Sequence, residues 1–388
     1  MRFSKRMDTL PPYLFAEIER KIAQKRAAGV DVISLGIGDP DLPTPAYIVE
    51  EMQRQVADPR NHRYPTTAGL QEFAQAAARF YQRRFGVEID PEEEFLAVLG
   101  GKEGLAHLCW STLDPGDLAL VPDPGYPVYS GCTLLAGAEP RYLPLRAENH
   151  FLPDLDAVSA ADARRAKVLF IGYPNNPTSA IVQEGFFERV VEFATKWDIA
   201  VVHDNAYSEL GFDGYSAPSF LATPGAKDVG VEFWSFSKPF NMTGWRVGFA
   251  VGNRQILEPL WRLKSNLDSG VFEAVQRTAA YILDGPWDSV HEMNALYQRR
   301  RDVLIEALRS IGVDAMPPKA TIYLWIPVPA GYTSAGFAEH VLDQAGVVVT
   351  PGTGYGQAGE GFVRISLTTP DDRIEEAVER IRRSLTLS

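Results

Sequence analysis

Short apolar runs alternate with helical stretches along the middle of this chain. Between residues 48 and 285, each run is bounded by Gly, Pro or Asp, and the segments between the runs repeat their apolar positions with a helical period. This alternation predicts a mostly parallel sheet that is covered by helices. Because open α/β sheets bind ligands outside the carboxyl ends of their strands, we expect a functional site where these strands end. The clearest predicted strands are Phe95–Leu99, Leu118–Val121, Val168–Gly172, Ala200–His203, Glu232–Ser235 and Val247–Val251.

The pattern changes after Pro286. A long helical stretch of mixed polar and apolar residues leads to three more apolar runs, and a helix that begins at Asp371 closes the chain. These elements predict a second, smaller α+β unit. Its predicted strands are Thr321–Pro327, Gly346–Val349 and Phe362–Thr368.

The N-terminal segment is predicted to join this smaller unit. Pro11-Pro12 opens a predicted helix that runs to about Ala28. The chain has 388 residues, and single cores tend to split beyond about 250–300 residues. The sequence therefore predicts a large domain over residues 48–285 and a small domain made of residues 1–47 and 286–388.

The composition excludes several classes of protein. The net charge is −12 and no block of Lys and Arg occurs, which argues against nucleic acids and membrane surfaces as partners. The two cysteines, Cys109 and Cys132, lie in mostly apolar surroundings without metal-ligand spacing, so we expect buried thiols in a reducing compartment and no metal site. The sequence contains no run of about 18 apolar residues and no apolar signal core near Met1. We therefore expect a soluble, cytoplasmic protein.

The stretch from Ser235 to Arg246 carries the most chemistry. Lys238 lies between small hydroxyl residues, and lysine is the side chain whose primary amine can form an imine reversibly with an aldehyde cofactor. Arg246, with Ser235 and Ser237, can bind a dianion through charge-assisted hydrogen bonds. An aldehyde beside an anchored phosphate describes pyridoxal 5'-phosphate. For this stretch taken alone, a solvent-facing lysine on an amphipathic turn is the alternative.

Three further motifs follow predicted strands. Leu99–Gly104 leads from a strand into a helix, so the backbone N–H groups near Gly101 and Lys102 can cup a phosphate. Asp204 ends another strand, and a carboxylate there can keep a pyridine nitrogen protonated. In Gly172–Thr178, the run Asn-Asn-Pro-Thr predicts either a ligand contact or a turn stabilised by an asparagine side chain.

Together these motifs resemble those of the fold-type I aminotransferases, the aspartate aminotransferase-like superfamily. The resemblance extends from about Gly36 to Arg364, which is nearly the whole chain. It implies the pyridoxal-phosphate-dependent transferase fold and an aminotransferase activity. Within the superfamily, the run from Ser235 to Asn253 is most similar to bacterial LL-diaminopimelate aminotransferases. The chain departs from the family at Gly101, where serine is usual, which puts one hydroxyl contact to the phosphate in doubt.

The resemblance implies roles for individual residues around the cofactor. Asp204 would pair with the pyridine nitrogen, while Tyr207 and Asn176 would bond the ring oxygen. Tyr126 would stack over the ring. Tyr64 would reach the phosphate of a neighbouring subunit, which implies a homodimer with shared active sites.

The resemblance also implies how the substrate is held and turned over. Arg364, a lone charge in an apolar strand, would hold the α-carboxylate in a bidentate pair, and the loop around Gly38 would close over the substrate near Asn176. Lys238 would then move a proton between the substrate Cα and the cofactor. An amino acid donor and a 2-oxo acid acceptor, 2-oxoglutarate, would react in turn with ping-pong kinetics.

Two more stretches bear on the amino donor. Lys102–Leu108 and Lys264–Glu273 resemble the LL-diaminopimelate aminotransferases of lysine biosynthesis, which implies LL-diaminopimelate as the substrate. Lys102, Tyr13 and residues near Ser269 are candidates for binding its distal ammonium and carboxylate. Spacing alone does not separate this donor from alanine, aspartate or an aromatic amino acid. Related folds also catalyse C–S elimination or serve as cofactor-binding regulatory modules, although no helix-turn-helix extension is evident.

Overall fold

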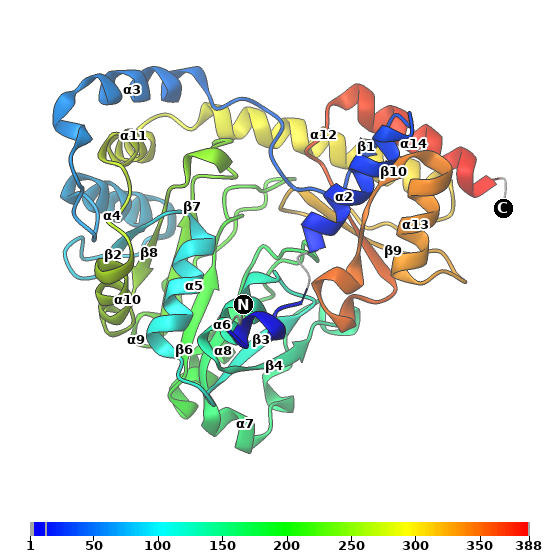
Figure 1. Cartoon of the computed structure of the whole chain (residues 1–388). Helices are drawn as coiled ribbons and strands as arrows, with labels where there is room; N and C mark the ends of the chain where they lie inside the picture. Colours follow the sequence, from blue (N-terminus) through cyan, green and yellow to red (C-terminus); the bar gives the residue numbers. More distant parts are fainter. Residues whose placement is uncertain (1–3, 12–13, 387–388) are drawn as a thin grey trace.

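The computed structural model describes residues 4–11 and 14–386 of the chain. Tyr13, one of the candidates for binding the distal end of the substrate, lies outside the described residues. A seven-stranded sheet of order β2-β8-β7-β6-β5-β3-β4 forms the larger part of the molecule (Figure 1). β8 runs antiparallel to both of its neighbours, and the other neighbours pair in parallel. The predicted α/β class with a mostly parallel sheet is confirmed. The strands are β2 (Phe95–Val98), β3 (Leu118–Asp123), β4 (Glu139–Pro144), β5 (Ala166–Ile171), β6 (Ala200–Asp204), β7 (Gly230–Ser235) and β8 (Gly248–Gly252).

Helices pack on both faces of this sheet because successive strand residues point to opposite sides. On β7, Phe233 packs in an apolar cluster with Leu108 of α5 and Leu260 of α10. The adjacent Trp234 packs in a second cluster with Phe80 of α4. The sheet is therefore buried on both sides, as its near-continuous apolar strands predict. The helices of this part are α3 (Ala46–Ala57), α4 (Gln71–Phe85), α5 (Gly101–Thr112), α6 (Val128–Ala136), α7 (Ala160–Arg165), α8 (Phe186–Trp197), α9 (Ala226–Val229), α10 (Arg254–Leu267) and α11 (Glu273–Asp284).

A smaller antiparallel sheet of order β11-β12-β9 lies on the other side of the molecule (Figure 1). Its core includes Leu324 of β9, Ile365 of β12 and Val341 of α13. The long helix α12 connects the two parts, because Val290 packs in the core of the large sheet and Tyr297 packs in that of the small one. The elements are α12 (Asp288–Ser310), β9 (Tyr323–Pro327), α13 (Ser334–Ala345), β10 (Val347–Val348), β11 (Thr350–Pro351), β12 (Phe362–Ser366) and α14 (Asp371–Thr386).

The N-terminal segment packs on the C-terminal part of the chain. α2 (Leu14–Ala27) places Ile18 and Ile22 against Leu342 and Val348. β1 (Ile33–Ser34) then pairs in parallel with β10. A short helix α1 (Arg6–Thr9), which the sequence did not predict, lies near α6 instead. The division into domains of residues 48–285 and of 1–47 with 286–388 stays a prediction.

Three of the differences between the predicted and the observed strands have a clear physical reason. β4 was not predicted because Glu139–Pro144 is an edge strand with mostly exposed side chains, so its sequence lacks an apolar run. The predicted strand Gly346–Val349 is too long, since Gly346 caps α13 with a φ of +65°. Thr321 has a φ of +75° and lies before β9, which begins at Tyr323.

The remaining connections include short 3₁₀ helices, and both cysteines are buried and free. Among the helices that the structure describes, none has the length and apolar character needed to cross a membrane. The 3₁₀ helices are η1 (Pro59–His62), η2 (Ala147–Asn149), η3 (Leu155–Ala157), η4 (Phe220–Ala222), η5 (Thr243–Trp245), η6 (Gly352–Tyr355) and η7 (Gln357–Gly359).

Candidate active site

A cavity of about 350 Å³ opens where strands of the large sheet end and the small sheet begins. Asp204 ends β6, Ser235 ends β7, and Arg364 reaches the same cavity from β12. This is the edge at which open α/β sheets bind ligands. The sequence-predicted residues that line the cavity are Gly38, Gly101, Lys102, Tyr126, Asn176, Asp204, Tyr207, Ser235, Ser237, Lys238, Arg246 and Arg364.

Lys238 reaches the cavity from the turn that follows β7. Its Nζ donates a hydrogen bond of 2.8 Å to the carbonyl oxygen of Gly38. A Cβ added at Gly38 would lie 2.2 Å from the Tyr323 hydroxyl, so only glycine lets the loop backbone come so close. The loop between β1 and α3 thereby holds the lysine amine inside the cavity.

The predicted phosphate cup faces Arg246. Nη2 of Arg246 donates to the carbonyl of Leu99 at 3.2 Å, and Nη1 donates to the carbonyl of Thr243 at 2.8 Å. Arg246 has a φ of +54°, a strained conformation for a non-glycine residue that is often found at ligand sites. Gly100 has a φ of +83°, and a Cβ there would lie 2.4 Å from Arg246 Nη2. Residue 100 must be glycine for the turn and the guanidinium to pack together.

The cup has room for an anion in front of Gly101. α5 begins at this residue, so the first backbone N–H groups of the helix and its dipole point into the cup. A Cβ added at Gly101 meets nothing within 4 Å, so the missing serine is not excluded by crowding. Arg246 and the buried Ser235 and Ser237 complete the cup. These donors fit a phosphate dianion.

Asp204 is a half-buried acid beside Lys238. Tyr129 donates a hydrogen bond of 2.9 Å to its Oδ2. Burial raises the pKa of the Asp204 carboxyl, and the Tyr129 bond opposes that shift only in part. The neighbouring His203 points to the opposite side of β6, where its Nδ1 lies 2.7 Å from Oε1 of the buried Glu232. Ionisation of this carboxyl is unfavourable when no ligand is bound, and a cationic ring nitrogen beside it would stabilise the carboxylate.

Arg364 is held flat beside the cavity. Its guanidinium donates to Oδ1 of Asn176 and to the carbonyl of Gly36, both at 2.8 Å, and lies 3.9 Å from the centre of the Tyr323 ring. The Tyr323 and Tyr207 hydroxyls are 3.1 Å apart. Burial raises the pKa of Tyr207, whereas Arg364 and Lys238 outweigh burial and lower that of Tyr323. A guanidinium plane held in this way suits a bidentate pair with a carboxylate.

One predicted residue stands apart from this constellation, and several lining residues were not predicted. Tyr64 is 88% exposed and does not line the cavity. Tyr13 cannot be placed. The sequence did not single out Tyr323, which lies in an apolar strand, or Glu19 on α2, whose spacing is that of any amphipathic helix. Other lining residues that were missed are Ile37, Asp39, Ala206 and Thr243.

The comparisons with known proteins agree with this geometry. Residues 30–381 match the family model of aminotransferase class I and II. The chain belongs to the class I and II aminotransferases. It is 55% identical to the LL-diaminopimelate aminotransferase of Moorella thermoacetica over 99% of each chain, and 57% identical to that of Desulforudis audaxviator over 98% of this chain and 97% of the relative.

A solved structure of this fold shows that the fold is shared by enzymes with other donors. A single mutant of the Thermus thermophilus aspartate aminotransferase matches with a TM-score of 0.92 and 30% identity, over 99% of this chain and 100% of that one. The predicted aspartate aminotransferase-like fold is confirmed. Aminotransferases of class I and II use pyridoxal 5'-phosphate, so this chain is a pyridoxal-phosphate-dependent aminotransferase. The cup of anion-binding donors and the half-buried acid described above fit that cofactor.

Proposed function

We propose that this aminotransferase moves an amino group between LL-diaminopimelate and a 2-oxo acid, 2-oxoglutarate, in lysine biosynthesis. The observation that carries the proposal is the identity of 55% over 99% of both chains to a relative with that activity in its name. The charges that line the cavity support it independently. The cavity offers more charged groups than a cofactor and a simple amino acid would use.

The charge balance suggests which groups meet the distal end of the substrate. Among the described residues, the cations that line the cavity are Lys102, Lys238, Arg246 and Arg364, and the acids are Glu19, Asp39 and Asp204. In our proposal the cofactor uses Lys238, Arg246 and Asp204, and the α-carboxylate uses Arg364. In our proposal Lys102 contacts the distal carboxylate, and Glu19 or Asp39 contacts the distal ammonium. LL-diaminopimelate brings both groups, whereas alanine brings neither and aspartate brings only a carboxylate.

The residues around the reacting atoms suggest how the chain performs the transfer. When bound, the cofactor supplies a reactive aldehyde and a protonated ring that stabilises negative charge at the substrate Cα. Arg364 would hold the α-carboxylate so that the Cα–H bond faces Lys238. The Lys238 Nζ would then take the proton from Cα, and such general base catalysis contributes roughly 10²–10⁴-fold.

Four more side chains would set the position and charge of the ring. Asp204 would hold the proton on the ring nitrogen, and Tyr126 would pack over the ring face. Asn176 and Tyr207 would bond the ring oxygen. Asn175, the other asparagine of this turn, has a structural role, because its side chain bonds Gly172 and Thr178. The turn-stabilising role of the Asn-Asn-Pro-Thr run thus belongs to Asn175, and in our proposal the ligand contact belongs to Asn176.

We further propose a symmetric homodimer in the cytoplasm with two composite sites. The large exposed Tyr64 ring, which lies outside its own cavity, supports this arrangement. Each Tyr64 would reach the phosphate in the partner's site.

A donor panel tests the proposed substrate. LL-diaminopimelate, its meso isomer, alanine, aspartate and phenylalanine would each be assayed with 2-oxoglutarate. We expect the highest kcat/KM for LL-diaminopimelate, because only this donor satisfies groups at both ends of the cavity. A higher kcat/KM with alanine, aspartate or phenylalanine would refute the substrate but not the aminotransferase activity.

Glu19→Gln sharpens this test. It should lower kcat/KM for LL-diaminopimelate by about tenfold or more, through loss of a charge-assisted contact, and leave the value for glutamate, which has no distal ammonium, nearly unchanged. Glu50→Gln on α3 is the matched control outside the cavity. An equal loss with both donors would show that Glu19 does not read the distal ammonium.

A further inference from the structure

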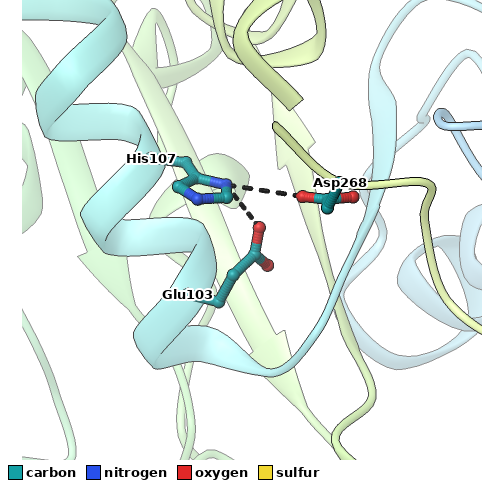
Figure 2. Close-up of side chains that lie close together, drawn as sticks. All are labelled: Glu103, His107 and Asp268. Carbon is teal, nitrogen blue, oxygen red and sulfur yellow. Dashed lines mark ion pairs between the residues drawn. The ribbon is translucent and has the colours of Figure 1, made fainter. Parts of the chain in front are cut away.

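Four titratable side chains meet between α5 and α10, outside the cavity. Glu103 and His107 lie one turn apart on α5, and Asp268 follows the end of α10 as its C-cap (Figure 2). Lys264 lies near the end of α10. They come from the two stretches whose resemblance pointed to LL-diaminopimelate, yet none of the four lines the cavity. These four side chains therefore join the two stretches at a place away from the substrate.

A buried ammonium is at the centre of this cluster. Lys264 is fully buried, and its Nζ lies 2.6 Å from Glu103 Oε1 and 3.0 Å from Asp268 Oδ2. His107 Nδ1 lies 2.6 Å from Glu103 Oε1 and 3.7 Å from Asp268 Oδ2. Burial opposes ionisation of Glu103, but His107 and Lys264 outweigh it and lower the pKa of that carboxyl. Removing one member of such a buried pair leaves its partner uncompensated.

A metal ion is the alternative occupant of this position. The ligand atoms of Glu103, His107 and Asp268 lie within 4.8 Å of one another, as they would around a divalent cation. The Lys264 ammonium already bonds both carboxylates. It supplies the positive charge that a metal would bring, so the cluster is complete with its own lysine.

One arm of the cluster leads to the phosphate cup. Oε2 of Glu103 accepts a hydrogen bond of 2.8 Å from the backbone N–H of Leu99. The carbonyl of Leu99 accepts the bond from Arg246. Ammonium, carboxylate, residue 99 and guanidinium thus form one continuous chain of contacts. A displaced Glu103 would release the turn that starts the cup.

The other arm leads to the segment that follows Tyr64. Oδ1 of Asp268 accepts a hydrogen bond of 2.8 Å from the N–H of Gly270. Gly270 has a φ of +85°, and a Cβ there would lie 3.0 Å from the carbonyl oxygen of Thr66. The loop after α10 is therefore packed directly on this segment. The same lysine fixes both arms.

We propose that Lys264 is a positioning residue for the phosphate of the cofactor. Its ammonium fixes Glu103, and Glu103 holds the Leu99–Gly101 turn in the orientation in which the first N–H groups of α5 and Arg246 face the phosphate. Lys264 itself touches neither the cofactor nor the substrate. The inference rests on the phosphate site proposed above. It gives the contact between the stretches Lys102–Leu108 and Lys264–Glu273 a role in holding the cofactor.

The test compares two cofactors that differ only in the phosphate. Pyridoxal 5'-phosphate and pyridoxal are titrated into the full-length protein after removal of its cofactor, and each Kd is measured by fluorescence. For Lys264→Met, we expect the Kd of pyridoxal 5'-phosphate to rise about tenfold or more, as for loss of a charged hydrogen bond. The Kd of pyridoxal should change by less than about twofold, and the ³¹P signal of the bound cofactor should move toward its position in free solution.

Further variants separate this role from general destabilisation. Lys264→Met with Asp268→Asn keeps the net charge of the cluster and should show the same selective loss. Lys227→Met is the matched control, since Lys227 bonds Glu94 at 2.6 Å in the large domain without any link to the cup. This control should leave the ratio of the two Kd values unchanged.

The outcomes that overturn the inference are distinct from failure of the proposed site. If Arg246→Ala leaves the ratio of Kd values unchanged, the phosphate site itself is wrong. The positioning role is wrong if Arg246→Ala weakens binding of pyridoxal 5'-phosphate selectively but the Lys264 variants do not. In that case both Lys264 variants would raise the Kd of the two cofactors by the same factor, or would change neither Kd. A rise in the thermal midpoint of the wild-type protein with zinc alone would also overturn it, because the cluster would then be a metal site.

Discussion

Burial of Asp204 at the end of β6 raises the pKa of its carboxyl even though Tyr129 donates a hydrogen bond to it. A carboxyl with a raised folded-state pKa binds its proton more tightly in the native state than in the unfolded state. Its contribution to stability is therefore lost as the pH rises through the usual carboxyl range toward the folded-state pKa. A bound cofactor would lower the pKa of this carboxyl again, because its cationic ring nitrogen favours the charged carboxylate.

Asp204→Asn should therefore have opposite effects on stability and on catalysis. Without cofactor, the variant should be as stable as the parent or more stable at neutral pH, and this difference should shrink as the pH falls. Turnover should drop by roughly 10²–10³-fold, in the range seen on removal of other preorganised electrostatic partners. Urea unfolding at several pH values and kcat measure the two effects. A variant with nearly parental turnover would show that Asp204 only caps its turn.

Replacement of Arg364 should change how the substrate is bound. Its guanidinium is fixed by Asn176, Gly36 and the Tyr323 ring, so a bidentate pair with a carboxylate forms at little entropic cost. Arg364→Lys should raise the KM for the amino donor about tenfold or more and also lower kcat, because Cα–H alignment loosens. The absorbance of the bound cofactor should stay unchanged. An unchanged KM would mean that the arginine serves only the packing of β12.

At the scale of elements, the turn from β2 into α5 decides how the phosphate is received. Gly100→Ala would force a side chain into a φ of +83° and bring its Cβ to 2.4 Å from Arg246. We expect a loss of stability of about 1–3 kcal/mol from the backbone alone, together with weaker binding of pyridoxal 5'-phosphate.

Gly101→Ser is the neighbouring control for this turn. The space at this position is open, so the serine should be tolerated and should strengthen cofactor binding if its hydroxyl reaches the phosphate. Thermal unfolding measures the stability of Gly100→Ala and Gly101→Ser, and cofactor titration measures their affinity for pyridoxal 5'-phosphate. A tolerated Gly100→Ala would mean that the turn adapts more freely than the structure indicates.

At the scale of the whole molecule, two chains are predicted to share each active site. Tyr64→Ala and Lys238→Ala should each be inactive as homodimers. After mixing and exchange of subunits, each heterodimer would contain one site with both residues intact. We expect recovery of roughly a quarter of the parental activity, since half of the dimers would be mixed and each would have one working site. Size-exclusion chromatography checks the dimer, and no recovery would indicate self-contained sites.

The sequence by itself determined the sheet and most of the site. Apolar runs of a buried parallel sheet are recognisable locally, and the residues that follow them meet at one edge because parallel strands end together. Asp204 could be selected because it ends such a strand, Lys238 because its amine lies near small hydroxyl residues, and Asn176 through the family resemblance; all three line one cavity. β4 was missed because an edge strand needs no apolar run.

Only the tertiary structure decided which side chains from distant parts of the sequence reach the site. Glu19 approaches from α2, and Tyr323 contacts both Gly38 and Arg364 from β9. The bond between Lys264 and Glu103 joins residues far apart along the chain. Local periodicity shows that such side chains lie on a helix or a strand, but not which other element they will meet. That choice is made by the packing of whole elements, because the burial of their apolar faces fixes where the few charged groups between them must pair.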